Sequence, residues 1–318
     1  MKSAFIGALA LLFGAAGPLA VSASGLAWDQ KPDSLALLKD GQIVWRFNYG
    51  GKEIKPNFHP LAVAGGPMLS CYQPKDHPWH RGLWFSWKYV NKVNYWEESK
   101  KTGLPEGVTA WKAPEVHAKP DFSARFVLDL NYHPSNGPVV LTEHRVITVS
   151  APDQAGGYHL DWDMTFRAAA TALLDRAPPV DENGVNRSGG YAGLGIRGAE
   201  DLRDAQVATS EGPVEYENHR FRGRAPALDF SGVADGRAGG VAFLDDSANL
   251  NSPTPWYVIN APPMYYISPA VITYHPQTLE TGETLALRYR VVVHPDRLTP
   301  EQLRQASAQY KTDLGAAR

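Results

Sequence analysis

Alternating apolar and polar positions recur along the chain and predict β-strands. The clearest case is residues 158–166, where Tyr, Leu, Trp, Met and Phe alternate with polar neighbours. Residues 34–38 and 43–47 flank an Asp-Gly turn, and residues 124–130 and 139–149 flank a Pro-Ser-Asn-Gly turn. Each of these pairs predicts a β-hairpin with one buried face.

The same pattern continues toward the C-terminal end, where one helix is also predicted. Further strands are predicted at residues 240–244, 256–259, 270–274 and 284–293. A helical pattern is convincing only after Thr299, which is followed by Pro300 and an early acidic residue. Many strands with one terminal helix predict an all-β fold, a large antiparallel β-sandwich with a short C-terminal helix. No repeat or linker divides the chain, so we expect a single domain over residues 24–318.

The first 23 residues have the pattern of a secretory signal peptide. Lys2 precedes an apolar run over residues 4–13, and small residues occupy positions 21–23. We expect cleavage after Ala23, or alternatively after Ala27, and export to the periplasm or the cell exterior. An uncleaved membrane anchor is the alternative, but the apolar run is short for a membrane span.

Composition and charge exclude several functional classes. The chain has 33 acidic and 31 basic side chains among 318 residues, so it carries no electrostatic signature for nucleic acid or anionic membranes. A mean hydropathy of -0.31 and the lack of a long apolar run after residue 25 exclude a polytopic membrane protein. Cys71 is the single cysteine, which excludes an internal disulfide and a zinc ribbon.

The densest group of chemically active residues lies at positions 76–87. His77 and His80 are three residues apart, Pro78 stiffens the loop between them, and Arg81 follows. Histidine exchanges protons near neutral pH, and arginine stabilises negative charge, so this segment predicts an acid/base pair beside an anion-binding group. The alternative is a structural turn whose histidines bond to nearby backbone.

The same histidines could instead bind a divalent metal. A third ligand could come from His59, Glu97 or Glu98, but no H-E-x-x-H motif fixes such a geometry. We therefore predict no metal and no other cofactor, and keep a divalent ion as an alternative.

Two adjacent carboxylates follow a tryptophan in the segment that ends at Glu98. Apolar neighbours such as Trp96 raise the pKa of a carboxyl group, which suits a general acid. Because successive side chains of a strand point to opposite faces, Glu97 and Glu98 cannot act as a pair with each other. Each could also be an exposed acid at a strand end. Asn94 lies just before them as a predicted substrate contact.

A literal G-x-G-x-x-G occurs at Gly193, Gly195 and Gly198, but we reject it as a dinucleotide motif. No strand precedes it, no amphipathic helix follows it, and its surroundings are rich in β-pattern. Small residues in a strand allow a ligand or another chain segment to approach closely. Tyr191 and Arg197 in this segment are therefore predicted ligand contacts.

Aromatic residues near the C-terminal third could form a platform for a sugar ring. Sugars have apolar C–H faces and hydroxyl edges, which Trp and Tyr contact well. Trp256, Tyr265 and the loop residue His275 are the predicted contacts, although core packing explains many aromatic residues equally well.

Six blocks of the chain resemble the bacterial family of unknown function DUF6807, also called PmoA-like. They cover residues 58–61, 76–85, 90–98, 191–197, 253–257 and 282–290, and the His-Pro-x-His-Arg-Gly-Leu-Trp block is the most specific. The resemblance implies a role in carbohydrate utilisation and a galactose-mutarotase-like β-supersandwich. Trp79 stands where the family commonly has histidine, which weakens a three-histidine metal site. A membrane-embedded methane oxygenase subunit is excluded, because it would need several spanning helices.

These observations predict an exported carbohydrate-active enzyme that cleaves a glycosidic bond of an oligosaccharide or glycoside by hydrolysis or elimination. The alternatives are a sugar mutarotase or epimerase and a non-catalytic glycan-binding protein. The predicted catalytic residues are His77, His80, Arg81, Glu97 and Glu98. The predicted substrate contacts are His59, Asn94, Trp96, Tyr191, Arg197, Trp256, Tyr265 and His275.

Overall fold

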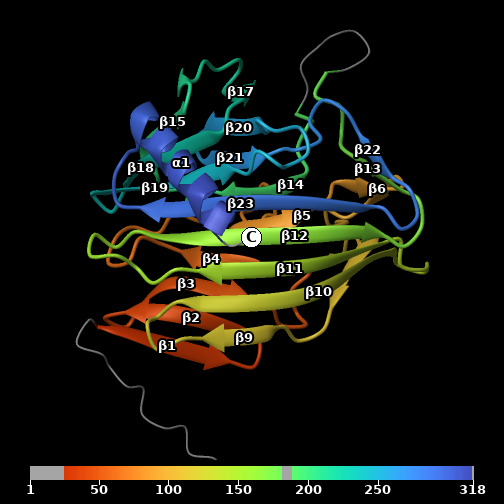
Figure 1. Ribbon diagram of the computed structural model, residues 1–318, viewed down its shortest axis with the longest axis horizontal. Coiled ribbons are helices and arrows are strands. Elements are labelled where there is room, and N and C mark those ends of the chain that lie inside the picture. Colours follow the sequence, from red (N-terminus) through yellow and green to blue (C-terminus); the bar gives the residue numbers. More distant parts are fainter. Residues whose placement is uncertain (1–24, 181–187, 317–318) are drawn as a thin grey trace, which may run out of the picture.

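Two large antiparallel sheets, a small third sheet and one C-terminal helix make up the described part of the protein (Figure 1). A computed structural model describes residues 25–180 and 188–316. The prediction of an all-β antiparallel sandwich with a terminal helix is confirmed. The predicted signal peptide at residues 1–23 lies outside the described residues.

Spatial order within the sheets places strands that are distant in the sequence next to each other. The nine-stranded sheet comprises, from edge to edge, β1 (Leu26–Lys31), β2 (Ser34–Lys39), β3 (Gln42–Asn48), β4 (Asn57–Leu61), β5 (Leu83–Ser86), β14 (Gly193–Arg197), β21 (Met264–Pro269), β20 (Pro255–Ala261) and β17 (Arg220–Arg224). The ten-stranded sheet comprises β16 (Gly212–Pro213), β15 (Arg203–Thr209), β18 (Ala227–Ala234), β19 (Arg237–Asp245), β23 (Thr284–His294), β12 (Tyr158–Ala168), β11 (Leu141–Val149), β10 (Ala124–Pro134) and β8 (Gly107–Trp111), with β9 (Glu115–Ala118) also paired to β10. The small sheet comprises β22 (Gln277–Leu279), β13 (Ala172–Asp175), β6 (Tyr89–Val90) and β7 (Val93–Asn94).

Both predicted hairpins are present, and one predicted strand is wrong. Strand β2 pairs with β3 across Asp40 and Gly41, whose positive φ angles of 49° and 80° fit a turn that follows the sheet twist. Strand β10 pairs with β11 in the second hairpin. Residues 270–274 form a turn instead of a strand, because the Thr273 amide donates to the Ala270 carbonyl at 2.8 Å; residues 270–273 are buried and Tyr274 is exposed. Their apolar side chains gave a strand-like pattern.

The core lies between the two large sheets and contains one fully buried ion pair. The strand β12 alternates as predicted, with Trp162 and its inward neighbours buried. On the neighbouring strand β11, Glu143 and Arg145 also point inward, with Nε of Arg145 2.5 Å from Oε1 of Glu143. The Tyr132 hydroxyl donates to the same carboxylate at 2.5 Å. A buried charge needs such partners because the sheet interior offers it no water.

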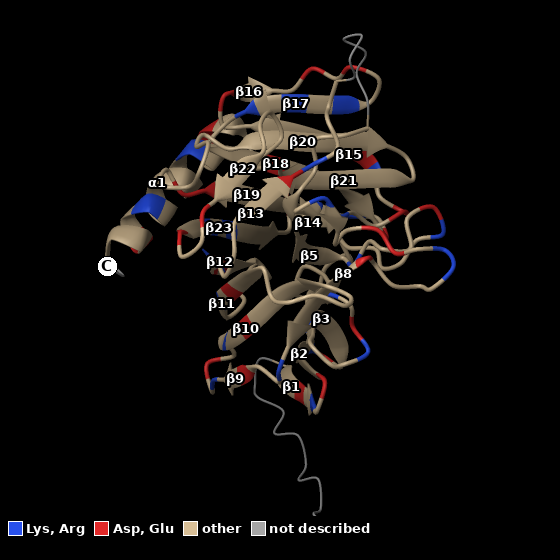
Figure 2. Ribbon diagram, turned by 90° about the vertical axis from the view of Figure 1, so that its right-hand side faces the viewer, with Lys and Arg blue, Asp and Glu red and all other residues tan. Residues whose placement is uncertain are grey.

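The helix α1 (Pro300–Ala316) packs on the outer side of the ten-stranded sheet (Figure 2). Thr299 begins it as predicted, since its hydroxyl accepts from the Gln302 amide at 3.2 Å while the Gln302 side chain accepts from the Thr299 amide at 2.9 Å. Its own side chains Leu303 and Tyr310 are buried against the sheet. Within the described part of the chain, no helix has the length and apolar character needed to cross a membrane.

Candidate functional site

A cavity of about 340 Å³ brings together the two predicted histidines and a wall of aromatic side chains. It lies on the outer face of the nine-stranded sheet, where Trp84, Tyr257 and Tyr266 form an apolar cluster separate from the main core. The described residues that line it are His77, Trp79, His80, Trp96, Ser188, Tyr191, Arg220, Tyr257, Ile259, Ala261, Met264 and Tyr266.

The alternation of side chains between the two faces of each strand decides which aromatic residues reach this cavity. Trp256 and Tyr265 point into the main core, where the Trp256 indole donates to the Ala225 carbonyl and the Tyr265 hydroxyl to the Leu202 carbonyl, each at 3.0 Å. Their chain neighbours Tyr257 and Tyr266 face the cavity instead, because side chains alternate along β20 and β21. The prediction of Trp256 and Tyr265 as cavity contacts is therefore wrong by one position on each strand.

Gly195 explains how Tyr266 fits into the cavity wall. A Cβ atom at this position would lie 2.5 Å from the Tyr266 hydroxyl, so a larger residue would displace the ring. Gly195 belongs to the strand β14, which agrees with the rejection of the glycine motif as a dinucleotide site. The close approach is made by a tyrosine side chain of the neighbouring strand.

His77 is held in the cavity by a chain of polar contacts. Its Nδ1 atom lies 2.9 Å from a carboxylate oxygen of Asp76, and Nη2 of Arg197 lies 3.1 Å from both oxygens of the same carboxylate. Burial raises the pKa of Asp76, but the hydrogen bonds from His77 and Arg197 outweigh it and lower that pKa below its usual value. Arg197 is fully buried, does not line the cavity, and contacts both Asp76 and the lining residue Met264, so it positions His77 through Asp76.

His80 is the more buried of the two histidines, with 3% of its surface exposed. Its ring stacks on His77 with centroids 4.7 Å apart and on Tyr266 at 5.3 Å. Burial, followed by the charges of His77 and Arg197, lowers the pKa of His80 well below its usual value. His80 therefore stays neutral at pH 7, and its buried Nδ1 atom has no hydrogen-bond partner among the described residues.

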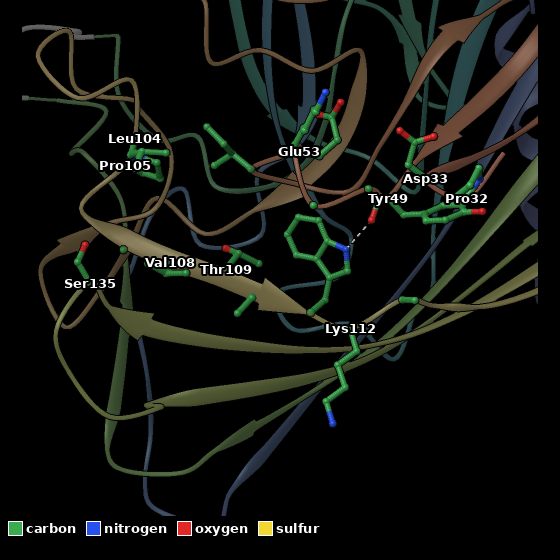
Figure 3. A pocket seen from close by; sticks show the side chains of 18 residues that line it. Pro32, Asp33, Tyr49, Glu53, Leu104, Pro105, Val108, Thr109, Lys112 and Ser135 are labelled. Atoms are coloured by element: carbon green, nitrogen blue, oxygen red, sulfur yellow. Dashed lines mark hydrogen bonds between the residues drawn. The ribbon is translucent and has the colours of Figure 1, made fainter.

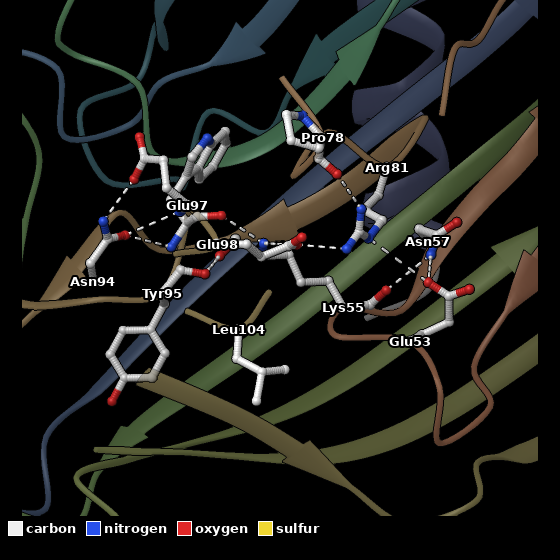
Figure 4. Close-up of polar contacts among 12 residues, drawn as sticks. Glu53, Lys55, Asn57, Pro78, Arg81, Asn94, Tyr95, Glu97, Glu98 and Leu104 are labelled. Atoms are coloured by element: carbon white, nitrogen blue, oxygen red, sulfur yellow. Dashed lines mark hydrogen bonds and ion pairs between the residues drawn. The ribbon is translucent and has the colours of Figure 1, made fainter. Parts of the chain in front are cut away.

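Glu97 lies directly behind the cavity and contacts it through Tyr191. The Tyr191 hydroxyl donates to Oε1 of Glu97 at 2.7 Å, and the ammonium group of Lys88 binds Oε2. The side-chain amide of Asn94 donates to Oε2 as well, at 2.8 Å (Figure 4). Burial raises the pKa of Glu97, but the charge and hydrogen bond of Lys88 and the hydrogen bonds from Tyr191 and Asn94 together outweigh it, so that pKa is lowered overall. The raised pKa expected of a general acid at this position is therefore not found, because the cation of Lys88 lies beside the carboxylate.

Arg81 and Glu98 belong to a buried network behind the cavity wall rather than to its lining. Nη2 of Arg81 lies 2.6 Å from Glu98, and its Nη1 donates to the Pro78 carbonyl at 2.7 Å (Figure 4). Lys55 donates to the Trp96 carbonyl at 2.7 Å, and burial lowers the pKa of Lys55 to about 7. These contacts fix the backbone of the two segments that carry the cavity residues.

The other predicted contacts are separate from the cavity lining. His59 bonds to the Ser70 hydroxyl at 2.9 Å and stacks on Tyr72, while His275 is exposed in a loop. Of the predicted residues, the structure brings His77, His80, Trp96 and Tyr191 together at the cavity. Sequence reasoning missed Arg220, although the alternating arginines of β17 were a visible signal.

Burial of His59 has a measurable consequence at acid pH. Burial lowers the pKa of His59 to about 4, against an ordinary value of 6.5. Between these values the unfolded chain binds a proton that the folded protein does not, so stability should fall as pH falls from about 6.5 to 4, by up to about 1.4 kcal/mol per pH unit. Urea unfolding at several pH values should show that the free energy of unfolding of His59→Gln falls less steeply with decreasing pH than that of the wild type. The exposed His117→Gln variant should follow the wild type, and equal slopes for all three proteins would contradict this expectation.

A second, larger hollow of about 610 Å³ lies beside the loop over residues 49–54 and the strand β8 (Figure 3). Its wall includes Trp111, whose indole donates to the Tyr49 carbonyl at 2.9 Å. None of the predicted site residues lines it, and its described lining contains no histidine. The smaller cavity is therefore the better candidate for proton-transfer chemistry.

The described residues do not form a metal site. Among residues 25–180 and 188–316, no three His, Cys, Asp or Glu side chains are grouped so that they could hold a metal ion. The alternative set of His77 and His80 with His59, Glu97 or Glu98 is therefore not assembled in this structure.

Comparisons with other proteins give a family and a distant likeness to sugar enzymes. A profile described as "Family of unknown function (DUF6807)" matches residues 34–308. The comparison with curated proteins gives no match.

Three solved structures show the distant likeness, each at 8% sequence identity. The galactosidase domain of an alpha-galactosidase-sucrose kinase has a TM-score of 0.38, and the match covers 86% of this chain but only 41% of that one. A putative aldose 1-epimerase from Klebsiella pneumoniae has a TM-score of 0.40, with 90% and 83% covered. A galactose mutarotase related enzyme from Lactobacillus acidophilus has a TM-score of 0.33, with 85% and 97% covered.

Proposed function

The chain belongs to the DUF6807 family of unknown function, and we propose an activity for it that rests on the cavity itself. We propose that the protein is a proton-transfer enzyme that opens and recloses the ring of a small sugar, as an aldose mutarotase or epimerase does. The proposal includes export of the mature chain, for which the pattern of residues 1–23 is the support.

One observation carries this proposal. The described cavity lining contains His77, His80 and Tyr191 but no aspartate or glutamate. Most glycosidases place two carboxyl groups on either side of the scissile bond. Glu97 and Glu98, the two glutamates predicted for such a role, instead form ion pairs behind the cavity wall, Glu97 with Lys88 and Glu98 with Arg81. Histidine-based proton transfer therefore has better support than hydrolysis.

The two histidines differ in a way that suits two separate roles. With its Nδ1–H donated to Asp76, neutral His77 has a free Nε2 lone pair that can take the proton of the anomeric hydroxyl. The carboxylate of Asp76 then stabilises the imidazolium. As C1=O forms and the C1–O5 bond breaks, the His77 imidazolium passes this same proton to O5, while neutral His80 donates a hydrogen bond that stabilises the negative charge developing on O5. The reverse transfers, from O5 back to the carbonyl oxygen, close the ring on either face.

The size and walls of the cavity support a ligand as small as one sugar ring. A volume of about 340 Å³ is near the lower end of the roughly 300–1,000 Å³ of small-molecule sites. Trp79, Trp96 and Tyr257 contribute flat apolar faces, which fit the C–H face of a sugar.

Elimination is a second candidate, and Arg220 is the observation that favours it. Elimination next to a carboxylate needs a base and a positive group more than a carboxylate pair. Arg220 and His77 line the same cavity and could supply these two functions.

A direct assay tests the proposed function. Freshly dissolved α-anomers of several aldoses should reach their equilibrium optical rotation faster with the purified protein than in buffer, without any change in mass. An unsaturated product from a uronate-containing oligosaccharide would instead support elimination. Sugar binding without acceleration in either assay would overturn the enzymatic proposal and leave a glycan-binding protein.

A further inference from the structure

Arg220 places a positive charge at the cavity and bonds there to neutral groups. It is the first residue of β17, the strand at the edge of the nine-stranded sheet (Figure 2). Arg220 lies opposite Ile259 of β20. Nη2 of Arg220 donates to the Ser188 hydroxyl at 3.0 Å, and Nη1 donates to the Asn218 carbonyl at 3.2 Å. Within residues 25–180 and 188–316, its Nε atom is buried and has no partner.

A second guanidinium lies close to Arg220. Both Arg220 and Tyr257 line the cavity, Arg220 acts to lower the pKa of the Tyr257 hydroxyl against the larger effect of burial, and the guanidinium of Arg222 lies 5.0 Å from the centroid of the Tyr257 ring. Burial, and to a smaller extent the charge of Arg220, lower the pKa of Arg222, while Tyr257 and Glu217 act in the opposite direction. Two guanidinium groups therefore lie near Tyr257, and Arg220 is the one of them that lines the cavity.

The carboxylates near the histidines do not cancel this potential at the cavity. Asp76 is tied to Arg197, and Glu97 is tied to Lys88, so each acid already has a basic partner behind the wall. Among the described lining residues, Arg220 is therefore the only one with a formal charge unless a histidine is protonated.

We propose that the sugar bound in this cavity is acidic and that its anionic group binds Arg220. This inference rests on the proposed function, since it names the class of sugar that the site would take. A guanidinium presents two parallel N–H groups that match the two oxygens of a carboxylate or phosphate. The acid could be a uronate carboxylate or the phosphate of a sugar phosphate, and both share this geometry.

A binding comparison tests the inference separately from catalysis. Isothermal titration at low salt compares galacturonate and glucuronate, galactose 6-phosphate and glucose 6-phosphate, and neutral galactose and glucose. We expect at least one acidic class to bind about tenfold or more tightly than its neutral parent, since hydrogen bonds to charged groups are stronger than those between neutral groups. The class that gains affinity distinguishes the uronate from the phosphate. Equal affinities for the acidic and neutral sugars would overturn the inference.

Variants on the same strand assign the effect to one guanidinium. Arg220→Gln should reduce the acid-to-neutral preference to near unity, and Arg220→Lys should retain part of it because the charge remains. Arg224→Gln is the matched control, since Arg224 donates to the Asn251 and Pro253 carbonyls and does not line the cavity. A preference unchanged in Arg220→Gln would overturn the role of Arg220. Thermal unfolding of each variant verifies that it is folded.

The two proposals can fail independently in these experiments. If neutral aldoses are anomerised and acids gain no affinity, the inference is wrong and the proposed function stands. If acids bind through Arg220 and no sugar is converted, the inference stands and the proposed function is wrong.

Discussion

His77→Gln should lower the turnover of the proposed ring-opening reaction about 100- to 10,000-fold, the usual contribution of a positioned acid/base group. Glutamine keeps hydrogen-bonding capacity but cannot exchange a proton at neutral pH. Sugar binding should change little, because the aromatic walls remain in place. Polarimetric rates, compared with affinities from titration, separate these two effects.

The matched control for this variant is His144→Gln. His144 also bonds through Nδ1 to an aspartate, Asp129, at 2.8 Å, but it lies exposed on β11 away from the cavity. Its replacement should leave turnover unchanged. If His77→Gln keeps turnover within about tenfold of the wild type, which is far less than a general base contributes, His77 is not the base.

Arg81→Met should lower the free energy of unfolding by about 3–5 kcal/mol, because it leaves the carboxylate of Glu98 buried without its closest cation. Arg81 and Glu98 are 2% and 9% exposed, and their atoms lie 2.6 Å apart. The change also removes the hydrogen bond to the Pro78 carbonyl, between the two site histidines. Urea unfolding followed by tryptophan fluorescence measures the loss.

An exposed ion pair provides the comparison for Arg81. Arg304 and Glu301 of α1 are 2.8 Å apart but 53% and 62% exposed. Arg304→Met should cost less than about 1 kcal/mol, as surface ion pairs usually do. Similar losses in both variants would mean that the Arg81 network has no special structural role.

The His77 and Arg81 variants are expected to differ although the two residues are close in the sequence. His77 and His80 line the cavity, whereas Arg81, which directly follows His80, bonds to Glu98 in the buried network. The sequence predicted this segment as one chemical unit. In the structure, its histidines face the proposed ligand and its arginine supports the loop that carries them.

Local sequence was sufficient to predict the fold class and several of its elements. The alternation over residues 158–166 predicted β12, and the Asp-Gly turn predicted the hairpin of β2 and β3. Thr299 predicted the start of α1. Each of these features depends on contacts between residues close in the chain, where side-chain period and turn conformation are properties of the local sequence.

Tertiary contacts were needed to establish which side chains face the cavity and which charges they meet. Strand β20 is buried on both faces, so its apolar pattern could not show that Tyr257, and not Trp256, faces outward. The Arg197–Asp76 and Tyr191–Glu97 contacts join residues 121 and 94 positions apart. Such partners are set by the pairing and packing of strands distant in sequence, and a partner within hydrogen-bond distance determines whether a carboxylate can transfer a proton.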